Sequence, residues 1–386
     1  LVFFLISFAG GMSIAGTTLV SQYTGMKNKA EVKKSAGQVF SLLAIFSVSL
    51  SFIGILITDW VLSMMGATDD VISKSSIYIK IIFSSMPFMF MIMTFASILR
   101  GWGDTVTPMI ISAISVGINV VLDPLLIAGF LGFPAMGVAG AALATLIARS
   151  AAAMVCIYLL FRGKRNLKIT LGDMKLKMEK VKQIFKIGIP ASLGQSTVAF
   201  GFLVLMSFVS EFGTTTLAAY GIGNRIINIV FIVIGGMAMA SVTMIGQNMG
   251  ADKIDRASKI LRQTILVTAS FLLVCSVVFY IFSNQLFGVF ISDRDVIEEG
   301  KLFMFGHGLF VMGFGIFRSV SAAYQASGKT IPTMIMGMLR LWAFRLPLAF
   351  ILAFTLGMGS GGLWLGMGIS NLLSAIMALL WASTGS

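Results

Sequence analysis

The chain has few of the residues that catalysis or metal binding requires. Its 386 residues include 2 cysteines and 1 histidine, and charged residues make up 11%. The two cysteines, Cys156 and Cys275, lie far apart in apolar stretches without CxxC spacing, so they predict neither a disulfide framework nor a metal site. An enzyme embedded in a membrane would need a cluster of His, Asp or Glu near one interface, and the sequence has none. We therefore expect a protein that is not an enzyme and has no cofactor.

Apolar residues dominate the chain instead. The hydrophobic fraction is 57% and the mean hydropathy is +0.96. Many apolar runs reach the ~20 residues with which a helix crosses a bilayer, which predicts an all-α membrane protein. The N-terminal residues already lie in an apolar run and show no signal-peptide pattern. The expected spans are 1–24, 36–58, 71–99, 105–130, 135–162, 183–210, 216–248, 259–283, 297–325, 330–357 and 361–384.

The net charge of +13 is concentrated in short segments between the apolar runs. Basic residues gather in 25–34, 162–182 and 250–262, whereas 59–70 and 293–299 are acidic. Because positive loops stay in the cytoplasm, this alternation predicts a multi-pass protein of the cell membrane with a basic cytoplasmic linker. The same distribution argues against nucleic-acid binding, and we expect a monomer.

An internal repeat predicts the architecture. Residues 10–29 align with 235–254 without a gap, a displacement of 235 − 10 = 225 residues. The first copy contributes Gly10, Gly11, Met12, Ala15, Thr18, Gln22 and Gly25, and the second Gly235, Gly236, Met237, Ala240, Thr243, Gln247 and Gly250. Both copies lead into a basic loop, so the halves run in the same direction and are related by an axis along the membrane normal.

The repeat also predicts the domain boundaries. The span at 183–210 has its counterpart before residue 1, so the first helix of the N-terminal half is missing from the expected pattern. We expect two six-helix bundles related by a pseudo-two-fold axis. The N-terminal bundle occupies 1–162 with five spans, the linker 163–182, and the C-terminal bundle 183–386 with six spans.

The most informative span is 105–130, because a carboxylate, Asp123, lies within it. Asn119 precedes Asp123 by four residues, which places both side chains on one face of a helix. Pro124 leaves a carbonyl one turn earlier without its donor and predicts a kink. Because a charge inside a membrane is costly and is usually functional, we expect Asp123 and Asn119 to bind a proton or Na⁺.

Structural interpretations of the same residues stay open. Asp123 could be neutralised by Lys80, which has a similar depth in another span. Asn119 is equally compatible with an interhelical hydrogen bond. His307, the only histidine, favours a packed and satisfied core residue over a proton relay.

Several motifs resemble those of the multidrug and toxic compound extrusion (MATE) transporters, within the multidrug/oligosaccharidyl-lipid/polysaccharide flippase superfamily. The resemblance covers nearly the whole chain and rests on GTTLVSQYTGMKN (16–28), LRGWGDTVTPM (99–109), INVVLDPLLI (118–127), GVAGAALAT (137–145), LAAYGIGNRI (217–226), MIGQNMGADKIDRA (244–257) and YQASGKTIPTM (324–334). It implies a secondary-active antiporter that exports amphipathic, often cationic, organic compounds by alternating access, driven by inward H⁺ or Na⁺ flow.

Within that family the chain resembles the DinF-type branch. The resemblance implies that Asp123, Asn119, Tyr78 and Thr145 form the ion-coupling and substrate-binding site of the N-terminal bundle. A further aspartate of that branch belongs to the first helix, which is missing here.

The C-terminal bundle departs from the other large branch, because its spans 183–210 and 297–325 have no acid beyond two glutamates near one rim. Gln195 and Arg345 are its candidate cavity residues, although Arg345, just before Pro347, is also suited to bonding freed carbonyls. The rival function, a flippase of lipid-linked saccharides, requires several cations facing a pyrophosphate, and Arg345 is the one that the sequence offers. A passive channel is disfavoured, because a two-bundle repeat provides no symmetric pore.

Overall fold

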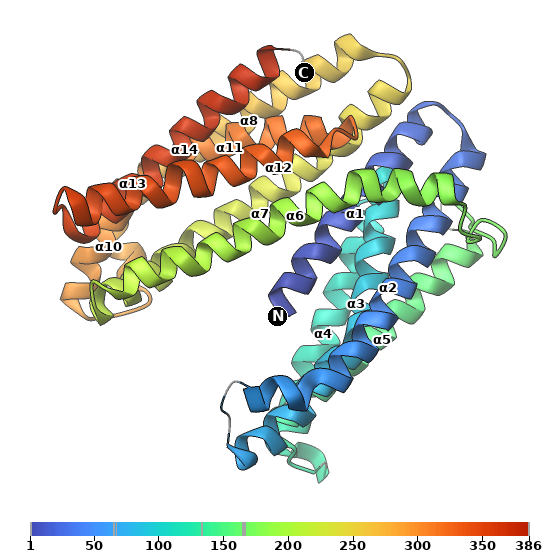
Figure 1. Cartoon of the computed structure of the whole chain (residues 1–386), viewed down its shortest axis with the longest axis horizontal. Helices are drawn as coiled ribbons and strands as arrows, with labels where there is room; N and C mark the ends of the chain where they lie inside the picture. The colour runs from blue at the N-terminus through green and yellow to red at the C-terminus, as the bar shows by residue number, and fades with distance from the viewer. Residues whose placement is uncertain (1, 65, 67, 133, 164–166, 385–386) are drawn as a thin grey trace. The chain divides into compact units, whose positions relative to one another are not determined.

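The computed structural model in Figure 1 is built almost entirely from long helices. The backbone is described over residues 2–64, 66, 68–132, 134–163 and 167–384, and the side chains of 2–5, 69–71 and 74 lie outside the description. The first half contains α1 (Val2–Gly25), α2 (Lys29–Met64), α3 (Asp69–Trp102), α4 (Val106–Ala128), η1 (Phe130–Gly132) and α5 (Gly137–Arg162). The second contains α6 (Met178–Ser210), α7 (Thr214–Gly250), α8 (Ile254–Ile281), α9 (Ser283–Gly288), α10 (Arg294–Gly306), η2 (Gly308–Phe310), α11 (Met312–Ala326), α12 (Thr330–Met338), η3 (Leu339–Arg345), α13 (Leu346–Phe350), η4 (Ile351–Thr355) and α14 (Gly359–Ser383).

The predicted all-α membrane fold is confirmed. Within the described residues, 9 helices are long and apolar enough to cross a bilayer. The segment Arg294–Phe310 and α11 make a tenth span if the two are counted as one. They meet at an angle of 41°, whereas the sequence predicted one continuous span over 297–325. Glycine is a poor helix former, and the break at Val311 lies between Gly308 and Gly313, which favours it. Helix α1 covers the first expected span.

The 225-residue repeat reappears in the backbone. Helix α1 ends at Gly25 and α7 at Gly250, and each is followed by a non-glycine residue in the left-handed region, Lys27 (φ 55°) and Asp252 (φ 58°). The next helices begin at Lys29 and Ile254, at the same displacement. The local structure of the two halves therefore follows one plan, while the axis relating them stays a prediction.

The chain forms two compact units, Ala15–Lys186 and Leu1–Ile14 with Ile187–Ser386. The start of α1 belongs to the second unit, where Gly11 lies against the backbone of Ser192 and Ser192 Oγ donates to the Phe8 carbonyl over 2.9 Å. In the first unit the segment after α5 packs on the helices, with Leu167 and Ile169 buried. The boundaries predicted from the sequence, with a cytoplasmic linker at 163–182, stay a prediction.

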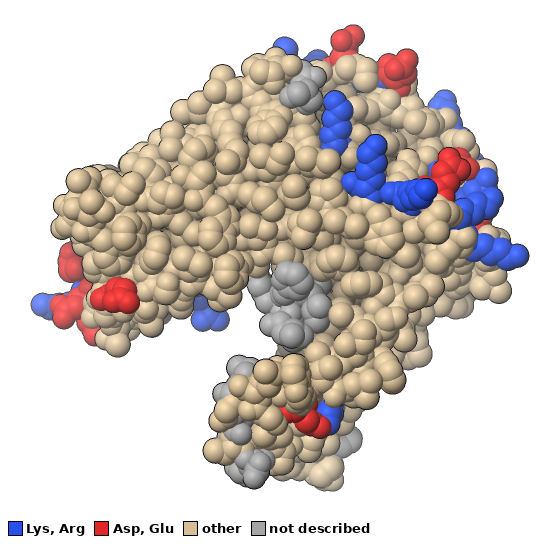
Figure 2. Space-filling view, viewed as in Figure 1, with Lys and Arg blue, Asp and Glu red and all other residues tan. Residues whose placement is uncertain are grey.

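The surface of each unit is suited to a lipid environment. On the face drawn in Figure 2, charged side chains gather toward the ends of the helices, and the wide area between them is uncharged. Large apolar side chains are exposed along the helices, for example Ile232 at 75% and Val120 at 63%. Apolar surface of this extent is unfavourable in water, so it must contact the bilayer.

Candidate functional site

The predicted pair on α4 is present. The Asn119 Nδ2 atom donates a hydrogen bond of 3.2 Å to Asp123 Oδ1, and both side chains are half-buried. The four-residue spacing places them one above the other on the helix face. Pro124 lies in the last turn and α4 continues through it to Ala128, so its missing N–H leaves the Val120 carbonyl without that donor. A carboxylate, an amide and a carbonyl thus lie on neighbouring turns of the same helix.

The structural alternative for Asp123, neutralisation by Lys80, is contradicted. Lys80 Nζ lies 2.7 Å from Asp59 Oδ2, and Ser76 also donates to Asp59. These residues join α2 to α3 near one end of the first unit. Among the described residues no cation forms an ion pair with Asp123. Within the described residues the Asp123 carboxylate is therefore stabilised by its hydrogen bond from Asn119 and by no ion pair.

Tyr78 and Thr145, the other predicted site residues, have different contacts. The Thr145 hydroxyl donates to the Ala141 carbonyl of its own helix over 3.0 Å. Tyr78, on α3, is close enough to Arg149 of α5 to interact with it electrostatically. Among the described residues neither side chain forms a hydrogen bond or ion pair with Asp123, so a shared four-residue site stays a prediction.

Arg149 was missed by the sequence reasoning. It lies one turn beyond Thr145, and its Nη1 atom donates to Ser85 Oγ over 2.9 Å, which links α5 to α3. A guanidinium stays charged in proteins, so a half-buried arginine in a span deserves the same weight as Asp123. The signal was available, because Arg149 lies deep within the predicted span 135–162.

The predicted C-terminal residues occupy different environments. Gln195 is exposed on α6, and its amide lies against Gly10 of α1. Arg345 is only 2% exposed. Its Nε and Nη2 atoms donate to Ser370 Oγ (3.0 Å) and Asn371 Oδ1 (2.8 Å) of α14, so the expected bonds to freed backbone carbonyls are replaced by side-chain bonds.

His307 is packed, as expected, but only partly satisfied. The side chain is 2% exposed and donates one hydrogen bond to the backbone carbonyl of Met367. Its Nδ1 atom is buried without a partner among the described residues. The expectation of a satisfied core histidine is therefore wrong for one of its two ring nitrogens.

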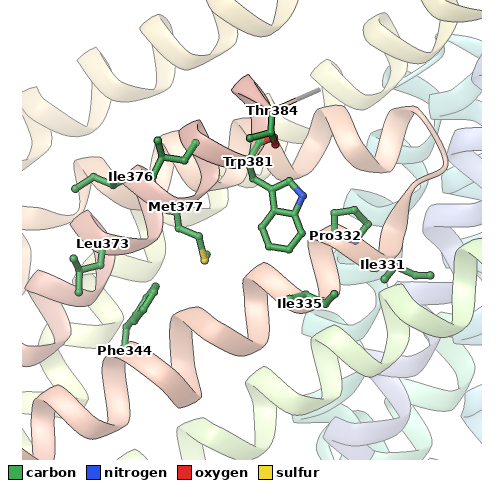
Figure 3. A pocket seen from close by; sticks show the side chains of 10 residues that line it. Ile331, Pro332, Ile335, Phe344, Leu373, Ile376, Met377, Trp381 and Thr384 are labelled. Atoms are coloured by element: carbon green, nitrogen blue, oxygen red, sulfur yellow. The ribbon is translucent and has the colours of Figure 1, made fainter. Parts of the chain in front are cut away.

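An open apolar groove of about 670 Å³ lies between α12–η3 and α14 (Figure 3). In Figure 3 the Trp381 ring and Met377 of α14 lie across from Pro332 and Ile335 of α12. The other lining residues are Ile331, Phe344, Leu373, Ile376, Leu380 and Thr384. None of the described residues that line the groove is charged, so it is suited to hydrocarbon rather than to an ion.

The ligands that the sequence offers for a cation are oxygens. Among the described residues no group of three or more His, Cys, Asp or Glu side chains comes together to hold a metal ion. Asp123 and Asn119 provide carboxylate and amide oxygens, which hard cations such as Na⁺ prefer. This pair is consequently the best-supported candidate position for an ion in the first unit.

Comparisons with known proteins agree with the sequence and the fold. The MatE family model matches residues 1–125 and 190–351. The probable multidrug resistance protein YoeA of Bacillus subtilis is 30% identical over 95% of this chain and 80% of its own length. The probable multidrug resistance protein NorM of Thermotoga maritima is 28% identical over 97% and 80%. The solved structure of a transporter of the multidrug/oligosaccharidyl-lipid/polysaccharide superfamily from Pyrococcus furiosus is 23% identical, covers 99% of this chain and 85% of its own, and superimposes with a TM-score of 0.91.

These matches span both compact units and the helices that carry Asp123 and Arg345. The members of this family are membrane transport proteins rather than enzymes, and the bilayer-spanning helices agree with a place in the cell membrane. The chain belongs to the MatE family, that of the multidrug and toxic compound extrusion transporters.

Proposed function

We propose that the protein is a secondary-active antiporter that exports amphipathic, often cationic, organic compounds, driven by H⁺ or Na⁺ entering the cell. Family membership supports the transport activity, and the names of the relatives from Bacillus subtilis and Thermotoga maritima support multidrug resistance. The assignment to the DinF-type branch belongs to the same proposal. So do small organic molecules as substrates, the monomeric state and the absence of any cofactor other than the coupling ion.

One observation carries the coupling role of Asp123. Its carboxylate lies in a membrane-spanning helix, accepts a hydrogen bond from Asn119, and pairs with no cation among the described residues, since Lys80 pairs with Asp59. A negative charge at this depth costs free energy unless a cation or proton visits it. Ion binding at Asp123 would therefore release stored electrostatic energy.

In the proposed cycle, the charge state of Asp123 determines which side of the membrane the transporter opens to. A proton or Na⁺ from outside neutralises Asp123, with Asn119 supplying a further oxygen. With Asp123 neutralised, α4 can adopt a conformation around Pro124 that the charged carboxylate disfavours. Substrate leaves outward in that arrangement, and release of the ion to the cytoplasm resets the protein. An ion can drive such a change only through its different affinities for the two states.

A second candidate is the flippase of lipid-linked saccharides, because the second unit has more buried cations than the sequence analysis expected. Arg340 and Arg345 are 8% and 2% exposed. Cations of this kind would suit a pyrophosphate better than a cationic drug. The two candidates differ in substrate charge and can be separated by transport assays.

The test is efflux from proteoliposomes containing the full-length protein under imposed pH and sodium gradients. Asp123→Asn should lose gradient-driven transport of a cationic dye, whereas Asp59→Asn, the matched acid at the end of α2, should retain it. Gradient-driven transport by Asp123→Asn at the wild-type rate would remove Asp123 from the coupling role. Transport of a lipid-linked pyrophosphate without dye transport would favour the flippase.

A further inference from the structure

The second unit contains a group of buried arginines, with a histidine among them and no described acid beside them. Arg340 is 8% exposed, Arg345 and His307 are each 2% exposed, and Arg318 is half-buried. Arg340 interacts electrostatically with both Arg318 and Arg345, and His307 with both Arg340 and Arg345. We call these four residues the arginine cluster. None of its arginines forms an ion pair in the described part of the chain.

The acids of this unit cannot neutralise the cluster from within the spans, because they lie at or near helix ends. They are Glu211, Asp252, Asp255, Asp293, Asp295, Glu298 and Glu299. Arginine stays protonated even when buried. Like charges in a low-dielectric interior repel one another and also lose their hydration, and both effects destabilise the folded state. A cluster of this kind is expensive to maintain unless a negative ligand joins it.

Hydrogen-bonding capacity is also left over within the cluster. The Nε atom of Arg340 and the Nδ1 atom of His307 are buried without a partner among the residues that the structure describes. The same holds for the Nδ2 atom of Asn371, whose side chain is 0% exposed and whose Oδ1 atom accepts from Arg345. Buried polar groups are nearly always bonded, so the two unpaired donors, Arg340 Nε and Asn371 Nδ2, point to a missing acceptor beside the arginines.

The backbone brings the two most buried arginines together. Segment η3 (Leu339–Arg345) is a π-helix, and the Leu346 N–H bonds the Leu341 carbonyl five residues earlier. In a π-helix the i→i+5 bonds place residues five apart on successive turns, which is the separation of Arg340 and Arg345. An α-helix would turn them about 140° apart at ~3.6 residues per turn. Irregular turns of this type are frequent at functional sites.

The surrounding side chains hold the guanidinium groups in place without neutralising them. The Arg340 guanidinium lies 4.5 Å from the Phe314 ring centroid and 5.3 Å from that of Phe317. Arg345 is fixed by Ser370 and Asn371. Arg318 lines a cavity of about 10 Å³ between α7 and α11, which has room for roughly one water molecule. Aromatic faces and neutral hydrogen bonds orient the cations and preserve their charge for a ligand.

We propose that the arginine cluster is a binding site for an anionic group, a phosphate or carboxylate at the head of an amphipathic molecule. Arg340 and Arg345 lie on the continuous segment α12–η4, which the 225-residue displacement aligns with α4, the helix that carries Asp123. The two units therefore carry intramembrane charges of opposite sign on equivalent helices. The inference deepens the proposed transport function by naming a substrate class, yet binding at the cluster needs no coupling at Asp123.

The test compares two amphiphiles with the same chain and opposite charge, octyl phosphate and octyltrimethylammonium, binding to the full-length protein in neutral detergent. Wild type should bind octyl phosphate at least about tenfold more tightly. Arg340→Met should weaken octyl phosphate binding about tenfold or more, the loss of one charge-assisted contact. Arg149→Met, which removes an intramembrane arginine from the other unit, and Arg262→Gln, which removes an exposed one, should bind as wild type does.

Thermal unfolding without ligand separates a binding role from a structural one. If Arg340 is kept for an anion, Arg340→Met should unfold at the same or a higher temperature, because it removes an uncompensated buried charge. A lower unfolding temperature together with unchanged octyl phosphate binding would make Arg340 structural and overturn the proposal. Equal binding of the two amphiphiles by wild type would overturn it without any variant.

Two further arms identify the source of the anion and separate the two proposals. Competition by inorganic phosphate would indicate a soluble anion, whereas competition in nanodiscs by phosphatidylglycerol but not phosphatidylcholine would indicate a lipid headgroup. Asp123→Asn should bind octyl phosphate normally. Loss of gradient-driven efflux in Asp123→Asn with normal anion binding supports both proposals. If the wild type shows normal efflux but does not bind octyl phosphate, only the proposal of anion binding at the arginine cluster is overturned.

Discussion

Substituting Glu31 should destabilise the first unit, because its carboxylate joins α2 to Lys180 of α6, which in turn contacts Tyr23 of α1. Glu31, in the first turn of α2, lies 2.7 Å from Lys180 Nζ at the start of α6 and 3.0 Å from Lys34 Nζ. Lys180 also donates to the Tyr23 hydroxyl over 2.7 Å and lies 4.3 Å from the centroid of that ring. Glu31→Gln would leave Lys180 largely buried without an anionic partner, with only the neutral groups of Tyr23 and Gln183 as hydrogen-bond acceptors.

The side-chain exposures set the magnitude. Lys180 is 14% exposed and Glu31 25%. Exposed ion pairs contribute up to ~1 kcal/mol, whereas removing one partner of a buried pair costs about 3–5 kcal/mol. The Glu31–Lys180 pair lies between these limits, so we expect Glu31→Gln to cost about 2 kcal/mol. Lys34 is 41% exposed, so Lys34→Gln should cost no more than ~0.5 kcal/mol.

The assay is thermal unfolding of the purified variants in a neutral detergent, arranged as a double-mutant cycle. Glu31→Gln, Lys180→Met and the double variant should show a coupling energy of about 1–2 kcal/mol, because each single change leaves the other charge without its partner. Additive effects, within ~0.3 kcal/mol, would show that the two side chains do not interact and would refute this reasoning.

Two other predictions follow from close contacts. A Cβ added to Gly11 would lie 2.2 Å from the Ser192 nitrogen, so Gly11→Ala should cost about 1–3 kcal/mol in unfolding experiments. Gly236→Ala, at the repeat-related position where nothing lies within 4 Å, should be neutral or stabilising, and equal losses would contradict this packing. Lys80→Gln should leave gradient-driven dye efflux within about twofold of wild type, because Lys80 pairs with Asp59; loss of coupling would instead tie Lys80 to Asp123.

Local features were predictable from the sequence. Asn119 and Asp123 are four residues apart on one helix, so their hydrogen bond follows from helix geometry alone. The repeat likewise predicted equivalent local structure, and helices end at both Gly25 and Gly250. Arg149 could also have been found, because a charge deep in an apolar run is visible without a structure.

Long-range features were not predictable. Lys80 could have paired with Asp123 or with Asp59, because depth along a span does not say which helices are neighbours. Arg340 was visible as a charge in the span 330–357, but its closeness to Arg345 was not predictable, because an ordinary helix would separate the two and only the π-helical turn places both on one face. Pro347 marked this region as irregular, but a proline does not specify which irregularity precedes it.

The claim that Asp123 binds the coupling ion is tested most directly by infrared difference spectroscopy of the purified protein, recorded on exchange between sodium-free and sodium-containing media and between acid and alkaline media. Either coupling ion changes the environment of the carboxylate. The account predicts a carboxyl band that Asp123→Asn removes and Asp59→Asn leaves in place. Identical difference spectra for wild type and Asp123→Asn would contradict it.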